Sequence, residues 1–285
     1  MRTARQPFLL LCSVLLVGGC TADKTPGLAS DPEPDRVVCK VKSESTTLTS
    51  NHATYEYTYG PGGHVSKIEK YIGDNYHVLQ DLIEVGSNST VNHHNLDYPA
   101  GSNVITTKFE NGGIFDGFPT RAEVAITEKG ITLTNRVAYF FYYDAKNRLS
   151  KVGKQTDFVK GDHEYDLTFS YNDQDNVIGM SYEFTSGPRS KVTVEASGYD
   201  DKPNPFVGIE HWYRVMHVDW DHNDPEPIFT ALSKNNLLGF AQADGTKRAT
   251  AYAYNEHGFP IKRTHTNTSA TGSASFEETF EYQCP

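Results

Sequence analysis

Residues 210–226 hold the densest group of side chains that could bind a metal ion or transfer protons. The group consists of His211, Trp212, His217, Asp219, Trp220, Asp221, His222, Asp224 and Glu226. Alternate side chains of an extended strand share a face, so His217, Asp219 and Asp221 would project together. One imidazole and two carboxylates form a ligand set that divalent metals accept. The first hypothesis is therefore a metal site in a metal-dependent or glycan-active hydrolase.

Prolines on both sides of this segment favour a different structure. Pro203 and Pro205 precede it, and Pro225 and Pro227 lie at its end. Proline has no N–H for a strand ladder, so a long loop between hairpins is the better interpretation. Such loops often contact ligands. The alternatives to metal binding are a ligand-contacting loop and a solvated structural loop.

Motifs of several common enzyme classes are absent from the sequence. It contains no Gly-x-Ser-x-Gly nucleophile elbow, phosphate-binding loop, dinucleotide fingerprint or His-Glu-x-x-His zinc motif. The neighbouring acids Glu277 and Glu278 would face opposite sides of a strand, so they could not work as an acid–base pair. We therefore predict no catalytic residue and no cofactor. A non-enzymatic binding or scaffold domain is favoured over an enzyme.

The N-terminus determines where the chain is sent. Two arginines precede an apolar run over residues 8–17, which is too short to cross a bilayer. The run ends in Val17-Gly18-Gly19-Cys20, which resembles the lipobox of bacterial lipoproteins. The resemblance implies a signal peptide over residues 1–19 and acyl chains on Cys20, which suffice for stable anchoring. A secreted protein with an incidental cysteine is the alternative.

The segment after the cleavage site is expected to be a tether. Residues 20–36 are rich in Pro, Asp, Ala and Ser and contain almost no large apolar side chain. Thr21, rather than Asp, follows the cysteine, which resembles lipoproteins sorted to the outer membrane. We therefore expect a lipid-anchored outer-membrane protein that faces the periplasm or the cell surface.

Charge limits the partners of the domain. The formal net charge is −10, and removal of the signal peptide makes it more negative because two arginines and no acid leave. Nucleic acid would be repelled by such a domain, so we expect no nucleic-acid partner. The expected partners are the membrane, through the lipid on Cys20, and an envelope protein or glycan.

Two cysteines are left to pair, because cleavage would remove Cys12 and acylation would occupy Cys20. Cys39 and Cys284 lie near the two ends of the remaining chain. In an oxidising compartment, we predict a disulfide that joins the first and last strands. Two unpaired buried thiols are the alternative.

Four hairpin patterns recur along the rest of the chain. In each, alternating aromatic residues end in a Tyr that Gly, Asp or Asn follows. The fourth residue after this Tyr is Gly63, Asn147, Asp175 or Gly258. These residue types tolerate the left-handed conformation that a tight hairpin requires. The pattern therefore predicts strands joined by short turns.

Alternation within the patterns indicates strands with one buried face. Tyr55, Tyr57 and Tyr59 share one side, and Glu56 and Thr58 share the other. Such a tyrosine stripe is typical of core packing or cross-strand pairing. For residues 37–285 we predict a single all-β domain, an antiparallel hairpin meander that is strongly curved or closed into a barrel-like sheet.

The Tyr-Asp-x-x-x-x-Leu units are similar to tyrosine-aspartate (Rhs-type) repeats. Together with the lipobox they resemble a Bacteroidota lipoprotein family of unknown function with a porin-like β fold. Residues 199–206 and 232–236 look like further features of these lipoproteins. The resemblance implies a fold and an envelope location but supplies no catalytic residues. An integral outer-membrane pore is the second alternative function, although Lys67, Glu69 and Lys151 lie where a lipid-facing band would be apolar.

Overall fold

Antiparallel strands make up most of the described chain. The computed structural model describes residues 39–47, 52–61, 63–73, 76–84, 90–95, 103–110, 118–128, 131–132, 137–156, 164–184, 191–206 and 224–284. The strands of the first half are β1 Lys40–Thr46, β2 Ala53–Tyr59, β3 Val65–Ile72, β4 Tyr76–Glu84, β5 Thr90–Asn95, β6 Asn103–Glu110, β7 Arg121–Glu128, β8 Ile131–Thr132 and β9 Val137–Tyr143. The elements of the second half are β10 Leu149–Gln155, β11 Tyr165–Tyr171, β12 Val177–Phe184, β13 Lys191–Pro203, α2 Glu226–Leu232, β14 Asn235–Gln242, β15 Lys247–Tyr254, β16 Pro260–Ser269 and β17 Gly272–Gln283.

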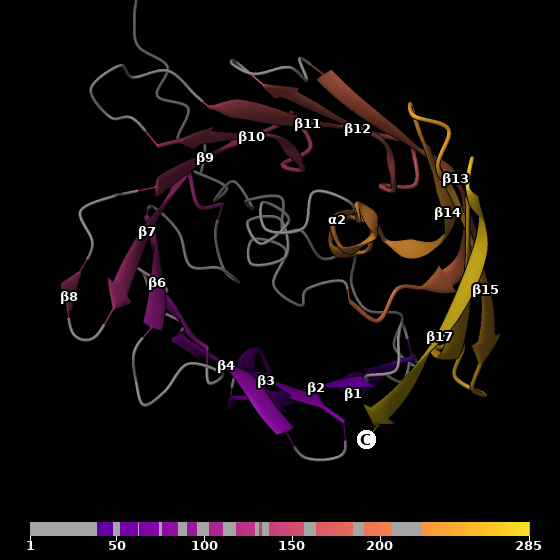
Figure 1. Ribbon diagram of the computed structural model, residues 1–285, viewed down its shortest axis with the longest axis horizontal. Coiled ribbons are helices and arrows are strands. Elements are labelled where there is room, and N and C mark those ends of the chain that lie inside the picture. The colour runs from indigo at the N-terminus through magenta and orange to yellow at the C-terminus, as the bar shows by residue number, and fades with distance from the viewer. Residues whose placement is uncertain are drawn as a thin grey trace, which may run out of the picture. The chain divides into compact units, whose positions relative to one another are not determined.

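The strands form one sheet that closes on itself (Figure 1). Neighbours in the chain pair antiparallel, except that β7 pairs with both the two-residue β8 and β9. The last strand, β17, pairs antiparallel with β1 and completes a ring of 16 strands. Closure removes the free edges that an open sheet would expose. The predicted all-β meander closed into a barrel is confirmed.

A disulfide lies at the seam where the ring closes. Lys40 pairs with Gln283 across this seam, and the adjoining residues Cys39 and Cys284 are bonded, with their Cα atoms 4.3 Å apart. The predicted pairing of these two cysteines is therefore confirmed. The first and last strands are joined both by hydrogen bonds and by a covalent link.

The predicted turn residues adopt the expected conformation. The φ angles are 80° at Gly63, 61° at Asn147, 62° at Asp175 and 81° at Gly258. In each turn the N–H of this residue donates to the carbonyl oxygen three residues earlier, at Gly60, Asp144, Asn172 and Asn255. The left-handed residue closes a tight hairpin in all four patterns, as the residue types predict.

Tyrosine hydroxyls near these turns form hydrogen bonds between the end of one strand and a neighbouring strand. The hydroxyl of Tyr171 donates to the Leu149 carbonyl oxygen at 2.7 Å, and that of Tyr282 donates to the Pro260 carbonyl oxygen at 2.7 Å. In both pairs, a tyrosine near the end of one strand reaches the first residue of the preceding strand. Burial raises the pKa of both hydroxyls, which keeps them protonated as donors.

Most buried side chains of the described strands are apolar, and many exposed ones are polar. On β11, Tyr165, Leu167 and Phe169 are buried, whereas Thr168 and Ser170 are exposed. Exposed polar side chains on other strands include Lys42, Glu56, Thr58, Lys108, Glu183, Lys191, Glu195, Lys247, Thr268, Thr279 and Glu281. Among the described residues, the exposed large apolar side chains are Leu82, Phe118, Tyr142, Ile178, Leu238 and Ile261.

The tyrosine stripe of β2 follows the same rule. Tyr57 is buried in the core, and Tyr55 and Tyr59 pack against it, while Glu56 and Thr58 are exposed. The prediction that this stripe belongs to the core is confirmed.

The link between β13 and β14 departs from the hairpin pattern. The strand β13 continues through Tyr199 to Pro203, with an irregular register against β14. The helix α2, which sequence reasoning did not predict, lies inside the ring (Figure 1). Its Ile228 and Phe229 are fully buried, and Phe229 stacks on Phe240 of β14. A barrel of this size is wide enough to hold such a plug.

Within the described ranges, no helix has the length and apolar character needed to span a bilayer.

Candidate functional site

The candidate site is the cluster of charged side chains where the start of α2 meets the inner wall. We call it the inner-wall network, and its members are Glu44, Asp224, Glu226, Arg248, Arg263, His265 and Glu278. Asp224 and Glu226 are the last acids of the polar segment 210–226. His217, Asp219 and Asp221, the proposed metal ligands, lie outside the described residues.

Strand alternation explains why these side chains point inward. On β15, Arg248 and Thr250 are buried, while Ala249 and Ala251 are exposed. The same alternation places Arg263 and His265 of β16 and Glu278 of β17 on the inner face, next to one another in register. The inner wall therefore carries these charges side by side as a direct consequence of sheet geometry.

Arg248 lies between the two acids that introduce α2. Its Nη1 is 2.6 Å from Glu226 Oε2 and 2.9 Å from both carboxylate oxygens of Asp224. Its Nε donates to Asn267 Oδ1 at 2.7 Å. Burial lowers the pKa of Arg248, but the charges of Glu226 and Asp224 outweigh it and raise the pKa above its ordinary value.

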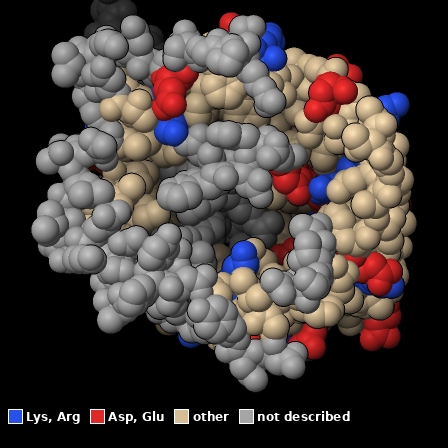
Figure 2. All heavy atoms as spheres, viewed as in Figure 1, with Lys and Arg blue, Asp and Glu red and all other residues tan. Residues whose placement is uncertain are grey.

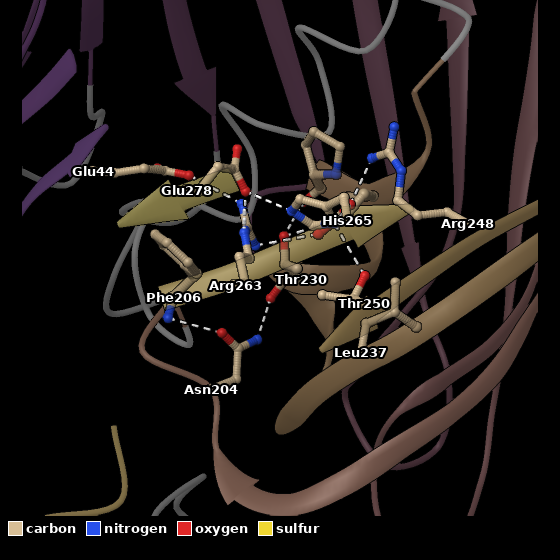
Figure 3. A network of polar contacts seen from close by, with 12 residues as sticks. Glu44, Asn204, Phe206, Thr230, Leu237, Arg248, Thr250, Arg263, His265 and Glu278 are labelled. Atoms are coloured by element: carbon tan, nitrogen blue, oxygen red, sulfur yellow. Dashed lines mark hydrogen bonds and ion pairs between the residues drawn. The ribbon is translucent and has the colours of Figure 1, made fainter. Parts of the chain in front are cut away.

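Arg263 connects three carboxylates from three parts of the chain. Its Nη2 donates to Glu44 Oε1 at 3.0 Å, its Nη1 is 3.2 Å from Glu226 Oε1, and its Nε donates to Glu278 Oε2. Figure 3 shows this guanidinium between the Glu44 and Glu278 side chains. Because Glu44 lies on β1 and Glu278 on β17, the network spans the seam of the barrel.

His265 is completely buried beside Arg263. Its Nε2 is 2.7 Å from Glu278 Oε2, and its Nδ1 is 3.1 Å from Thr250 Oγ1 and 3.4 Å from Glu226 Oε2. Burial alone would raise the pKa of Glu278, but Arg263 and His265 lower it to about 2. Glu278 is therefore held as a carboxylate at any ordinary pH.

Polar residues from the segments 199–206 and 232–236 contact the other end of α2. The Nδ2 of Asn204 donates to the carbonyl oxygens of Thr230 and Ser233, and its Oδ1 accepts from the Phe206 N–H. The N–H and Nδ2 of Asn236 donate to Asp200. Residues 199–206 and 232–236 thus converge on one place and fix both ends of the β13–β14 link.

Ion pairs with arginine are the main interactions of the carboxylates in this network. Glu44, Glu226 and Glu278 each pair with Arg263. Within the described ranges, no three His, Cys, Asp or Glu side chains are arranged to hold a metal ion. The wall gives the Glu226 carboxylate one hydrogen bond from Arg248 and the nearby charge of Arg263.

Sequence reasoning found only part of this site. It singled out Asp224 and Glu226, and the opposite orientation expected for Glu277 and Glu278 is confirmed, because Glu277 contacts Lys262 on the outer face. It missed Arg248, Arg263 and His265. In the sequence, these three residues are visible only as charged or imidazole side chains at alternate strand positions. Their neighbours on the outward positions are Ala, Lys or Thr.

Comparison with known proteins bears on the fold. No protein-family profile matches the sequence, and no curated protein matches it. Among solved structures, it is similar to a porin-like protein from Bacteroides uniformis, with a TM-score of 0.59 and 9% identity, over 85% of this chain and 98% of that chain. A porin-like protein from Bacteroides vulgatus has a TM-score of 0.47 and 10% identity, over 86% and 99%. At this identity the first match supports the expected porin-like fold and nothing further.

Proposed function

We propose that this chain is a lipid-anchored cell-envelope protein whose barrel binds a ligand or partner without chemical turnover. Outer-membrane delivery and acylation of Cys20 are part of the proposal, and they rest on the lipobox-like sequence. An acylated cysteine followed by a tether would hold the barrel close to the membrane without inserting it.

The polarity of the barrel is the observation that carries the proposal. A membrane-spanning barrel turns an apolar band to lipid and a polar face to its lumen. In this barrel many outer positions of the described strands are charged, such as Lys42 and Glu281, whereas apolar side chains such as Leu167 and Phe169 lie inside. Figure 2 shows acidic and basic side chains next to one another around the described part of the end-on face. Exposed charges on the outer wall, such as the Lys42–Glu281 ion pair, favour contact with water.

A binding role is supported by the polar groups inside the barrel. A buried ion network is costly to build, because each charge loses its hydration. Arg248, Arg263 and His265 nevertheless lie on the inner wall, where apolar residues would pack more easily. Their retention favours recognition at this wall over a purely structural core.

A binding screen tests this proposal. The chain with Cys20→Ser, which lacks the acylation site, would be purified and screened against envelope glycans and outer-membrane extracts. We expect saturable binding and no release of modified product. Absence of binding across the screen, or turnover of a bound glycan, would contradict the proposal.

The integral pore is the second function, and the closed 16-strand barrel favours it. If the protein is a pore, the isolated barrel needs detergent to stay in solution, because its apolar lipid-facing band would aggregate in water. The hydrolase based on His217, Asp219 and Asp221 is a third proposal. It requires stoichiometric bound metal and loss of activity in His217→Ala, which metal analysis and a glycan-cleavage assay would measure.

A further inference from the structure

We infer that Arg248, Arg263 and His265 form a receptor for a carboxylate group, and that Glu226 occupies this receptor from within the chain. The inference rests on the proposed binding function and assigns its ligand class, a small carboxylate-bearing molecule such as a uronic acid. Three side chains from two adjacent strands surround one carboxylate: Arg248 donates a hydrogen bond to Glu226 at 2.6 Å, and nitrogens of Arg263 and His265 lie 3.2 Å and 3.4 Å from its oxygens. Figure 3 shows these three residues on one side of the wall.

The barrel wall positions the donors without help from α2. Asn267 accepts a hydrogen bond from Arg248, whose guanidinium also lies over the Phe240 and Phe276 rings. Thr250 contacts the His265 ring, which stacks on Phe276 with centroids 4.5 Å apart. Donors held in place before a ligand arrives lose little entropy when it binds.

The same holds for the second arginine. Glu44 and Glu278 hold Arg263 from two sides, and its guanidinium lies over the Phe280 ring at 5.2 Å. The hydroxyl of Tyr57 in turn donates to Glu44. Arg263 would therefore keep its place if Glu226 were withdrawn.

The wall requires an anion at this position. Both ion pairs that the structure gives Arg248 are with Asp224 and Glu226, which belong to one short segment. If that segment left, a buried guanidinium would lose its charge partners, and an unpaired buried charge is strongly destabilising. A ligand carboxylate would again pair with the Arg248 charge, so the receptor selects anions over neutral molecules.

The occupant belongs to a short element that takes no part in the strand pairing of the wall. Glu226 begins α2, a helix of seven residues, which is shorter than a helix that is stable alone in water. None of the strand pairings of β15, β16 and β17 involves α2. A carboxylate ligand would therefore compete with Glu226 for the same donors, and the ring of strands would stay closed.

Chemical rescue of a vacated receptor tests the inference. In the mature full-length chain with Glu226→Ala, the removed side chain leaves room for acetate, which carries the missing carboxylate. We expect acetate to raise the melting temperature saturably and to recover much of the loss caused by the substitution. Sodium chloride at the same ionic strength and neutral acetamide should not do so.

Two variants serve as controls. Glu277→Ala removes a carboxylate on the outer face of the same sheet, beside Lys262, and should show no specific response to acetate. Adding Arg248→Met to Glu226→Ala should abolish the response, because it removes the closest donor. Equal effects of acetate and chloride on Glu226→Ala would overturn the inference.

The design remains decisive if Glu226→Ala does not fold in chloride. Refolding yields in acetate and in chloride then become the measurement, and a higher yield in acetate supports the receptor. Equal yields, including no folded protein in either salt, overturn it. The acetate experiment does not require the natural ligand to be known, so its failure contradicts only the carboxylate receptor. A negative screen against glycans and envelope components contradicts the proposed binding function instead.

Discussion

Glu277 and Glu278 are adjacent in the sequence but lie in opposite environments. Glu277 pairs with Lys262 on the outer face, and Glu278, whose side chain is 12% exposed, pairs with Arg263 and His265 on the inner face. We expect Glu278→Gln to lower the free energy of unfolding by about 3–5 kcal/mol, because it leaves part of a buried charge network without its partner. Glu277→Gln, the matched control, should change it by less than about 0.5 kcal/mol. Urea unfolding of both variants measures this, and equal effects would contradict the buried network.

The lowered pKa of Glu278 also predicts how stability depends on pH. The folded pKa of about 2 lies below the ordinary value of 4.5, so the stabilisation is fully present above pH 4.5. It is lost as the pH falls from 4.5 towards 2, because over this range the unfolded chain binds a proton at Glu278 that the folded protein does not. Unfolding curves across this range should show a smaller loss of stability in Glu278→Gln than in the wild type. Parallel curves for the two proteins would refute the assignment.

The tyrosine hydroxyls at the turns provide a second prediction for single residues. Tyr171→Phe and Tyr282→Phe each remove a donor from a main-chain carbonyl, at Leu149 and Pro260. We expect each to cost about 1–3 kcal/mol, since a partly buried carbonyl loses its partner. Tyr142→Phe, at an exposed ring on β9, is the control and should change stability little. Thermal or urea unfolding is the measurement, and losses no larger than that of the control would count against this role.

Among the elements of the fold, the hairpins could be predicted from the sequence, and the helix α2 inside the barrel could not. A Tyr followed by a turn residue, with Gly, Asn or Asp four positions later, is a local signal, and local sterics decide the conformation of Asn147 and Asp175. The helix α2 has no comparable signal, because its seven residues follow one proline, include another near the start and have no side-chain cap. Burial of Ile228 and Phe229 against the wall stabilises it, and that depends on the whole barrel.

The inner-wall network was hidden for the same reason. Alternation shows that Arg248 and Thr250 share a face of β15, but it does not show which face is inside. The face that lies inside depends on how neighbouring strands pair. The acids that contact Arg263 there, Glu44 and Glu226, come from distant parts of the chain. The sequence cluster at 210–226 pointed towards the site, but of its members only Asp224 and Glu226 fall within the described residues.

Packing of α2 against the wall gives a prediction for this element. Phe229→Ala should lower the free energy of unfolding by about 3–5 kcal/mol, because it opens a cavity next to Phe240. Leu238→Ala, on the exposed side of β14, should cost far less. Unfolding curves of the two variants measure the difference. Equal and small losses would show that α2 does not contribute to the packed interior.

For the whole molecule, closure of the barrel depends on the seam between β1 and β17. Strands β1 and β17 are paired by hydrogen bonds, and the Cys39–Cys284 disulfide joins their ends. Replacing both cysteines by serine should lower the free energy of unfolding by about 2–5 kcal/mol, because the unfolded chain regains the freedom that a long covalent loop removes. Urea unfolding of this variant and of the reduced wild type should agree. Unchanged stability would mean that hydrogen bonds and packing alone close the barrel.

Detergent phase partition of the full-length protein and its Cys20→Ser variant tests the central claim most directly. We predict that the wild type enters the detergent phase and that Cys20→Ser remains in the aqueous phase as a folded, disulfide-bonded barrel. The lipid would then supply the membrane attachment, and the polar outer face would keep the barrel in water. If Cys20→Ser also entered the detergent phase, the barrel itself would be the membrane-bound part, and a water-exposed barrel held by lipid would be contradicted.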